Sequence, residues 1–305
     1  MKLKLPRSRR NSDIIHLTGD TLLVGDIHGN PVDILSYRNS VLSMKRPIHN
    51  IILLGDIGFG FLHQKYRGKM SKTLSIIDAI GNTEGIEDLV IASLEKSTKQ
   101  SAKILINDIM CAAKLLTGNS KVKVFAIRGN HDDPRYWIPD TQLQKDIRKN
   151  NKNFYFLEDG FIDINNNLWL TVGGSVSIDR FTAQRIPGVS WWSGEEMKNF
   201  DSPLPVGYKK LTGILSHSGK TPDYASYKLP QCSEGEVAEA LDRELKTIES
   251  LAVRYNPEFW IYGHFHKSWI RTLAGEMLFF CLGEHEVTPL LVPELRKLLN
   301  ASKNA

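Results

Sequence analysis

Five short segments of this chain place aspartate, asparagine or histidine directly after an apolar run. These side chains bind transition metals and also carry out acid–base chemistry. The segments are Gly25-Asp26-Ile27-His28-Gly29, Gly55-Asp56, Gly129-Asn130-His131-Asp132, Ser216-His217 and Gly263-His264-Phe265-His266. Asp26 and His28 are two positions apart, so an extended backbone would turn both side chains to the same side. The recurrence of this pattern predicts one shared site.

The five segments offer more metal ligands than a single ion needs. The candidates are Asp26, His28, Asp56, Asn130, His217, His264 and His266. Carboxylate, imidazole and amide together suit Mn, Fe or Zn better than Mg or Ca. Two ions roughly 3.5–4 Å apart that share one carboxylate would account for the number. Such a pair can lower the pKa of a bridging water and hold a phosphoryl group for in-line attack by it.

The remaining histidines carry no such pattern, and we interpret them as surface or core residues. They are His16, His49, His63 and His285.

The elements that must position the ligands are buried strands. The apolar runs 22–24 and 51–54 flank a helix that Pro31 can open, which predicts a βαβ unit. Its right-handed crossover puts both strand ends on one sheet edge, so Asp26 and Asp56 should lie side by side. A hairpin is also expected over residues 14–24. Further strands are predicted at 122–127, 154–157, 161–164, 168–172, 211–215, 260–262 and 277–282, and helices at 76–80, 86–116 and 235–255.

The chain of 305 residues is long enough to bury a substantial core. We expect a single domain over residues 13–295, with a basic tail over residues 1–12 and a C-terminal tail over residues 296–305. A helical insertion is expected at about residues 61–120. It could cap the site, form a dimer surface or simply pack against the sheet, and we favour packing.

The net charge of +5 is matched by five basic residues near the N-terminus, a stretch that has no acid. They are Lys2, Lys4, Arg7, Arg9 and Arg10. This tail could contact nucleic acid, but a solvated terminus is the interpretation we favour. No apolar run approaches the ~20 residues of a membrane span, and no secretory signal is evident. The three widely spaced cysteines fit reduced thiols, so we expect a cytoplasmic protein without a membrane partner.

The five segments resemble the signature blocks of the calcineurin-like metallophosphoesterase superfamily, over residues 25–266. The resemblance implies an α/β fold, a four-layer sandwich of two central mixed β-sheets flanked by helices, with a dinuclear metal site at the strand ends. It implies that one ion is held by Asp26, His28, Asp56 and His266. It implies that the second is held by Asp56, Asn130, His217 and His264. Mn is the favoured metal, with Fe, Zn or Ni as alternatives.

The resemblance also implies catalytic roles. His131 is similar to the family's non-ligand histidine, which contacts phosphate and protonates the leaving group, and we expect Asp132 to orient its imidazole. The expected activity is hydrolysis of a phosphate ester by a metal-bridging hydroxide. Because no expected ligand is missing, a non-catalytic scaffold is the least favoured class.

The substrate is less sharply indicated. Gly29 and Arg128 are similar to the protein-phosphatase and diadenosine-polyphosphatase branch, whereas residues 58–60 and the terminal Gly-His-Phe-His are closer to phosphodiesterases and nucleases. We favour a phosphomonoesterase acting on a phosphoprotein, a nucleotide or a phosphorylated small molecule. The alternative is a phosphodiesterase or nuclease acting on cyclic nucleotides, DNA or RNA.

Three arginines are candidate substrate-binding residues: Arg128, Arg180 and Arg185. Arg128 could hold a phosphate through two hydrogen bonds. The loop that contains Arg180, Arg185, Trp191 and Trp192 could hold a phosphate and stack a base. In the alternative, a tryptophan of this loop fills the core and Arg180 pairs with a nearby glutamate.

Overall fold

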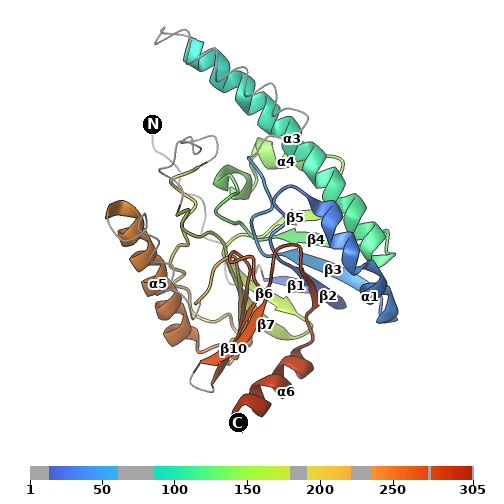
Figure 1. Cartoon of the computed structure of the whole chain (residues 1–305), viewed down its shortest axis with the longest axis vertical. Helices are drawn as coiled ribbons and strands as arrows, with labels where there is room; N and C mark the ends of the chain where they lie inside the picture. Colours follow the sequence, from blue (N-terminus) through green and yellow to red (C-terminus); the bar gives the residue numbers. More distant parts are fainter. Residues whose placement is uncertain (1–13, 61–85, 179–190, 221–234, 274–275, 304–305) are drawn as a thin grey trace.

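The computed structural model describes residues 14–60, 86–178, 191–220, 235–273 and 276–303 (Figure 1). Two mixed β-sheets lie face to face, and helices cover their outer faces. This is the α/β sandwich expected from the sequence.

The first sheet has five strands in the order β12-β2-β3-β4-β5. Their bounds are β2 (Asp20–Val24), β3 (Ile48–Leu53), β4 (Lys123–Ala126), β5 (Phe154–Phe156) and β12 (Val287–Pro289). Strands β2 to β5 are parallel, and only the edge strand β12 is antiparallel to its neighbour. Parallel strands buried on both faces read as continuous apolar runs, which explains why β2 and β3 were visible in the sequence.

The second sheet has seven strands in the order β1-β6-β7-β8-β9-β11-β10. Their bounds are β1 (Ile15–Leu17), β6 (Gly160–Ile164), β7 (Asn167–Val172), β8 (Gly213–Ser216), β9 (Phe259–Tyr262), β10 (Trp269–Leu273) and β11 (Met277–Cys281). The four neighbours β7, β8, β9 and β11 are parallel. Strands β6 and β7 form a hairpin whose turn residues Asn165 and Asn166 have φ of 51° and 61°. Positive φ at both positions is typical of a type I′ hairpin turn, and the strands that it joins confirm those predicted at 161–164 and 168–172.

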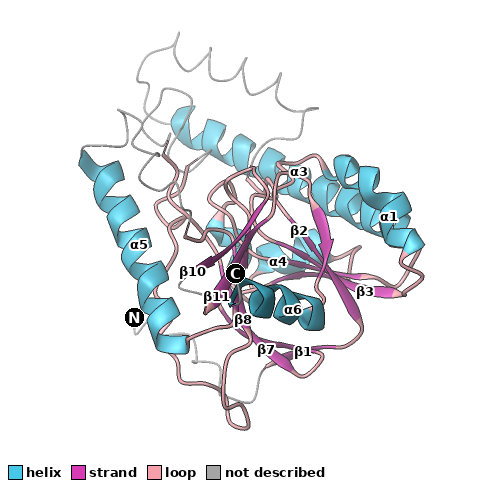
Figure 2. Ribbon diagram, turned by 60° about the horizontal axis from the view of Figure 1, so that its bottom comes forward, coloured by secondary structure: helices cyan, strands magenta, loops and turns pink. Residues whose placement is uncertain are grey.

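The helices form the outer layers. Their bounds are the 3-10 helices η1 (Pro31–Tyr37) and η2 (Pro134–Trp137), and α1 (Arg38–Ser43), α3 (Ile86–Thr117), α4 (Gln142–Arg148), α5 (Gly235–Tyr255) and α6 (Val292–Lys303). Figure 2 shows α5 and α3 on opposite sides of the sheets. The predicted helix over residues 235–255 is confirmed at both ends.

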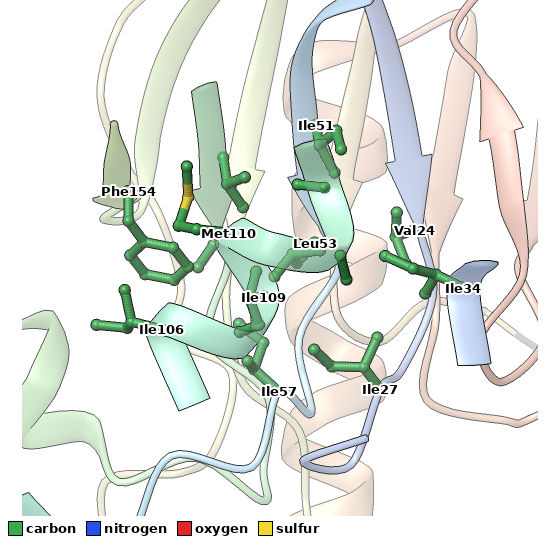
Figure 3. Close-up of a cluster of buried hydrophobic side chains, with 14 of the residues drawn as sticks. Val24, Ile27, Ile34, Ile51, Leu53, Ile57, Ile106, Ile109, Met110 and Phe154 are labelled. Atoms are coloured by element: carbon green, nitrogen blue, oxygen red, sulfur yellow. The ribbon is translucent and has the colours of Figure 1, made fainter. Parts of the chain in front are cut away.

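Side-chain alternation along β2 divides the core into layers. Leu22 and Val24 point to the helical face, whereas Leu23 points to the second sheet. On the helical face, Ile106, Ile109 and Met110 of α3 share one buried cluster with side chains of β2, β3 and β5, and Figure 3 shows Ile109 near Leu53 and Ile106 near Phe154. A third cluster lies beneath α5 on the far side of the seven-stranded sheet. Each sheet is therefore covered on both faces.

The long helix α3 connects β3 to β4 and packs against the five-stranded sheet. Its buried side chains recur at helical spacing: Ala102, Leu105, Ile106, Ile109, Met110, Ala113 and Leu116. This pattern agrees with the packing role favoured from the sequence. The rest of the predicted insertion, residues 61–85, lies outside the described residues, as does the predicted helix 76–80.

Two local predictions are wrong. Residues 14–24 do not form a hairpin, because β1 pairs with β6 in one sheet and β2 pairs with β3 in the other. The predicted C-terminal tail 296–305 instead falls largely in α6, whose Leu295 and Leu299 are buried between the sheets. Strands β10 and β12 were not predicted. Among the described residues, no helix is long and apolar enough to cross a membrane.

Candidate metal centre

Strand ends from both sheets supply the site. Strands β2, β3 and β4 of the five-stranded sheet are parallel, and so are β8 and β9 of the seven-stranded sheet. Their carboxyl ends precede the five segments singled out in the sequence. The facing sheets bring these ends together, so residues from position 26 to position 266 meet at one place.

A first cluster combines two carboxylates with two imidazoles whose ligand atoms all lie within 4.8 Å of one another: Asp26, His28, Asp56 and His266. His266 Nε2 is 3.1 Å from Asp26 Oδ2 and 2.9 Å from His28 Nε2. His28 Nε2 lies 3.9 Å from a carboxylate oxygen of both Asp26 and Asp56. These groups could hold a divalent cation.

A second cluster shares Asp56 with the first and adds His217 and His264, again within 4.8 Å. His217 Nε2 is 3.2 Å from Asp56 Oδ1 and 2.9 Å from Asn130 Oδ1. The other ring nitrogen of His217 lies 2.8 Å from the Leu54 carbonyl oxygen. That carbonyl accepts the Nδ1 proton, so Nε2 is the ring nitrogen that faces the cluster. Burial opposes the charged form of His217, but Asp56 and Asp26 outweigh it and raise the pKa of this imidazole to about 10, so Nε2 would release its proton on binding an ion.

The backbone of the site is unusual. His28, Asp56, His264 and His266 have φ of 41°, 44°, 71° and 53°. Residues other than glycine rarely adopt this left-handed region, and each such residue costs about 1–3 kcal/mol. His28 therefore departs from the extended backbone assumed in the sequence argument, although its side chain still reaches the cluster.

Glycines in the segments allow close approach of the ligands. A Cβ atom on Gly129 would lie 2.0 Å from the Asp56 backbone nitrogen. A Cβ atom on Gly263 would lie 2.3 Å from Asp26 Oδ1. Only glycine fits at these positions without displacing a candidate ligand.

The electrostatics of the site fit a cation. Asp26 and Asp56 are 0% and 1% exposed, and buried carboxylates require compensating positive charge. Burial opposes the charged form of Asp56, but the imidazoles of His217 and His131 outweigh it and hold its pKa well below the usual value. Burial and the charges of His217 and His131 lower the pKa of His264, which keeps this imidazole neutral. Its buried Nδ1 atom has no hydrogen-bond partner among the described residues.

His131 lies at the rim of the clusters. Its side chain is 27% exposed, and Nε2 is 3.8 Å from Asp56 Oδ2. Its backbone N–H donates to Asp56 Oδ1 at 2.7 Å. The imidazole is thus adjacent to the candidate ligands and open to solvent.

Asp132 differs from its predicted role. Its carboxylate is fully buried and accepts backbone N–H bonds from Ile57, Gly58, Phe59 and Gly129, at 3.2, 2.8, 2.9 and 2.8 Å. Burial and the neighbouring Asp56 raise the pKa of Asp132 to about 6, although the backbone hydrogen bonds act to lower it. The contacts give Asp132 the task of joining two loops of the site, and we withdraw the prediction that it orients His131.

Arg128 is also placed differently from the prediction. Its side chain donates to four backbone carbonyl oxygens, of Glu195 at 2.7 Å, Gly194 at 2.8 Å, Gly173 at 3.2 Å and Glu196 at 3.3 Å. The residue is 6% exposed, and burial lowers the pKa of its guanidinium. The guanidinium is committed to holding two loops together, which argues against the predicted phosphate contact.

The tryptophan loop is partly described. Arg180 and Arg185 lie outside the described residues. Trp192 is buried at 6% exposure and packs close to Gly60, which makes it unsuited to stacking a base. Trp191 Nε1 donates to Glu195 Oε1 at 2.9 Å. Both contacts agree with the alternative in which this loop is packed.

Two serines that contact candidate ligands were not predicted from the sequence. Ser177 Oγ accepts a hydrogen bond from Asn130 Nδ2 at 3.0 Å. Ser175 Oγ lies 3.1 Å from His264 Nε2. Ser175 follows Gly173-Gly174 at the end of β7, a strand end like the other five, but serine there is an ordinary loop residue. Ser175 could have been identified only from the pairing of β7 with β8, which brings the end of β7 to the site.

Comparison with known proteins identifies the family. The family model described as "Calcineurin-like phosphoesterase" matches residues 20–268, which is most of the chain. The chain belongs to this family, a superfamily of metal-dependent phosphoesterases that also includes some non-catalytic members.

No curated protein matches the sequence significantly. Solved structures resemble the fold at low similarity, among them the following three. The protein TT1561 of Thermus thermophilus has 9% identity and a TM-score of 0.43, covering 90% of this chain and 99% of its own. A protein of unknown function, AQ665 from Aquifex aeolicus, has 11% identity and a TM-score of 0.33, covering 91% and 99%. Phosphopantetheinyl hydrolase (PptH) from Mycobacterium tuberculosis has 11% identity and a TM-score of 0.33, covering 88% and 91%. These values are too low to carry a functional argument.

Proposed function

We propose that this protein hydrolyses a phosphate ester with the help of two divalent metal ions. The observation that carries the proposal is that buried Asp56 belongs to both ligand clusters. Asp26, His28, Asp56 and His266 would hold one ion. Asp56, Asn130, His217 and His264 would hold the other. Mn is the first candidate because the donors are carboxylate, imidazole and amide.

When bound, the ions would activate water and polarise the phosphoryl oxygens. The chain contributes the geometry. Asp56 is held by the His131 backbone N–H, so the position of the shared carboxylate is coupled to that of the rim histidine. His131 would hold a proton on its imidazole and donate it to the leaving oxygen. Asp26, Asp56 and His217 are buried, whereas His28 and His266 are 27% and 46% exposed, so water reaches the clusters from the side of these two histidines.

Phosphomonoester hydrolysis is the first candidate, as expected from the sequence. A phosphate contact from Arg128 would support monoester hydrolysis. The Arg128 side chain instead donates to backbone carbonyl oxygens. A phosphomonoester carries more negative charge than a diester and gains more from an additional cationic contact. This observation favours phosphodiester hydrolysis as the second candidate function.

The test compares p-nitrophenyl phosphate with bis-p-nitrophenyl phosphate, using chelator-stripped protein with and without added Mn²⁺. Faster Mn²⁺-dependent hydrolysis of the monoester would support a phosphatase, and phosphopeptides and nucleotides would be tried next. Faster hydrolysis of the diester would support a phosphodiesterase or nuclease. The absence of metal-dependent hydrolysis of both esters would contradict the proposal.

His131→Ala tests the acid role. An alkyl phosphate has a poor leaving group that needs a proton, so its turnover should fall roughly 100-fold or more. Turnover of the p-nitrophenyl ester should fall less, and metal content should not change. Full activity of the variant on alkyl phosphates would show that His131 is not the acid.

A further inference from the structure

Glu244 is a buried acid on α5 that none of the sequence patterns singled out. It is 3% exposed, although it lies on a helix that covers the outer face of a sheet. Its carboxylate accepts hydrogen bonds from Ser218 Oγ at 2.5 Å, from the Val176 N–H at 2.7 Å, and from Ser175 Oγ at 3.0 and 3.1 Å. These donors belong to the loops after β7 and β8, so Glu244 connects α5 to the strand ends of the site.

The protons available on Ser175 and His264 determine which group donates in each hydrogen bond of this chain. A carboxylate can only accept, so Ser175 gives its single hydroxyl proton to Glu244. Its oxygen must therefore accept from His264 Nε2, which lies 3.1 Å away. The ring proton of His264 is then on Nε2, and the lone pair is on Nδ1. That atom is the buried nitrogen without a partner among the described residues.

We propose that Glu244 is a positioning residue that acts through Ser175 to fix the tautomer and orientation of His264. The relay from Glu244 to Ser175 to His264 presents the Nδ1 lone pair to the second metal position. Glu244 itself does not touch the ion. This inference rests on the proposed function, because it explains how one of the proposed ligands is held. Groups that orient a metal ligand from behind are typically worth about 10–100-fold in metal affinity.

Two variants interrupt the relay at different points. Glu244→Gln keeps the shape but replaces one acceptor oxygen with a donor, so the three described donors, Ser218, Val176 and Ser175, face one acceptor. The Ser175 hydroxyl is then expected to turn and donate to His264 Nε2, which moves the ring proton to Nδ1. Ser175→Ala removes the relay and leaves the contacts of Glu244 with Ser218 and Val176. The matched control is Glu249→Gln, on the same helix, where the side chain is 59% exposed and pairs with Lys220.

The first measurement is a Mn²⁺ titration of chelator-stripped full-length protein by calorimetry. The wild type is expected to bind two ions. Glu244→Gln and Ser175→Ala should weaken one ion about 10–100-fold and leave the other unchanged. Glu249→Gln should behave as the wild type. A general loss of packing would weaken both ions, which separates positioning from a merely structural role.

The second measurement reads the tautomer without metal. Histidine ring ¹⁵N shifts of the metal-free protein are recorded, with the His264 signals identified from a His264→Asn variant. The wild type should carry its proton on Nε2, and both relay variants should shift it towards Nδ1. If Glu244→Gln does not fold, Ser175→Ala decides the question with the same two measurements.

The results distinguish this inference from the proposed function. Wild-type Mn²⁺ binding and an unchanged His264 tautomer in both relay variants would overturn the inference and leave the proposed function intact. A wild type that binds no second ion would contradict the proposed function. In that case the ¹⁵N shifts alone decide whether Glu244 controls His264.

Discussion

Replacing Arg128 with methionine should destabilise the fold without removing a substrate contact. The side chain is 6% exposed and donates to four backbone carbonyl oxygens, two of them at 2.7 and 2.8 Å and two at 3.2 and 3.3 Å. Methionine has a similar length but no donor, so the variant removes all four hydrogen bonds, and the Glu195 carbonyl keeps only the Ser175 N–H at 3.1 Å among its described donors.

The expected magnitude follows from these distances. The two short charge-assisted bonds contribute about 1.5 kcal/mol each and the two long ones about 0.5 kcal/mol each. Removing a buried charge recovers about 1–2 kcal/mol of desolvation cost, since burial already works against the charged guanidinium. We therefore expect the free energy of unfolding to fall by about 2–3 kcal/mol.

Urea unfolding followed by fluorescence measures this change. The matched control is Arg243→Met, because Arg243 is 56% exposed and pairs with the Glu196 side chain of the same loop at 3.3 Å. An exposed pair of this kind contributes less than about 1 kcal/mol. The reasoning would be refuted if Arg128→Met unfolded at the wild-type urea concentration while its KM for a phosphate ester rose tenfold.

Two further predictions concern buried and surface carboxylates. Asp132→Asn should lower the free energy of unfolding by about 2–3 kcal/mol in urea melts, because an amide has one acceptor oxygen for four backbone donors; wild-type stability would contradict this. Burial opposes ionisation of Glu258, but its bonds to Arg296 and Lys210 outweigh this effect and lower its pKa. The bonds of Glu258 with Arg296 and Lys210 therefore stabilise the fold at pH values above the pKa of Glu258 in the unfolded chain. This stabilisation is lost as the pH falls through the pKa of Glu258 in the folded protein. Glu258→Gln should cost about 1 kcal/mol or less at pH 7 and less than that near pH 3 by thermal unfolding; an equal cost at both pH values would contradict the sign.

The strand ends were predictable because their signals are local. The apolar runs before Asp26, Asp56 and Asn130 are parallel strands buried on both faces, and such strands read as continuous apolar sequence. The helix Gly235–Tyr255 was predictable for a similar reason, because its apolar positions recur at helical spacing. A strand or helix whose apolar pattern lies within its own residues could therefore be predicted from the sequence alone.

The roles of Arg128 and Asp132 could not be predicted because they depend on distant backbone. Both residues flank the Gly129-Asn130-His131 segment, where a catalytic role is a natural interpretation. Their partners are carbonyls near residue 195 and N–H groups near residue 58, and the sequence does not show which loops approach. The same limit explains the missed relay, since Glu244 is 69 positions from Ser175.

The predicted hairpin over residues 14–24 is wrong for a related reason. Residues 14–24 contain two short strands with a turn at Gly19, which is the usual pattern of a hairpin. Asn165, from the turn between β6 and β7, bonds both the N–H and the carbonyl of Gly19. This tertiary contact accompanies the pairing of β1 with β6, so the chain passes from one sheet to the other at the turn.

The sharing of Asp56 by two ions is the central claim, and metal stoichiometry tests it most directly. Purified protein is stripped, reloaded with Mn²⁺, separated from free ion and analysed for bound metal. The wild type should hold two ions, and His266→Ala and His217→Ala should each hold one. Asp56→Asn should lose both, because its side chain belongs to both clusters. An Asp56→Asn protein that is folded and still binds two ions with wild-type affinity would contradict the account.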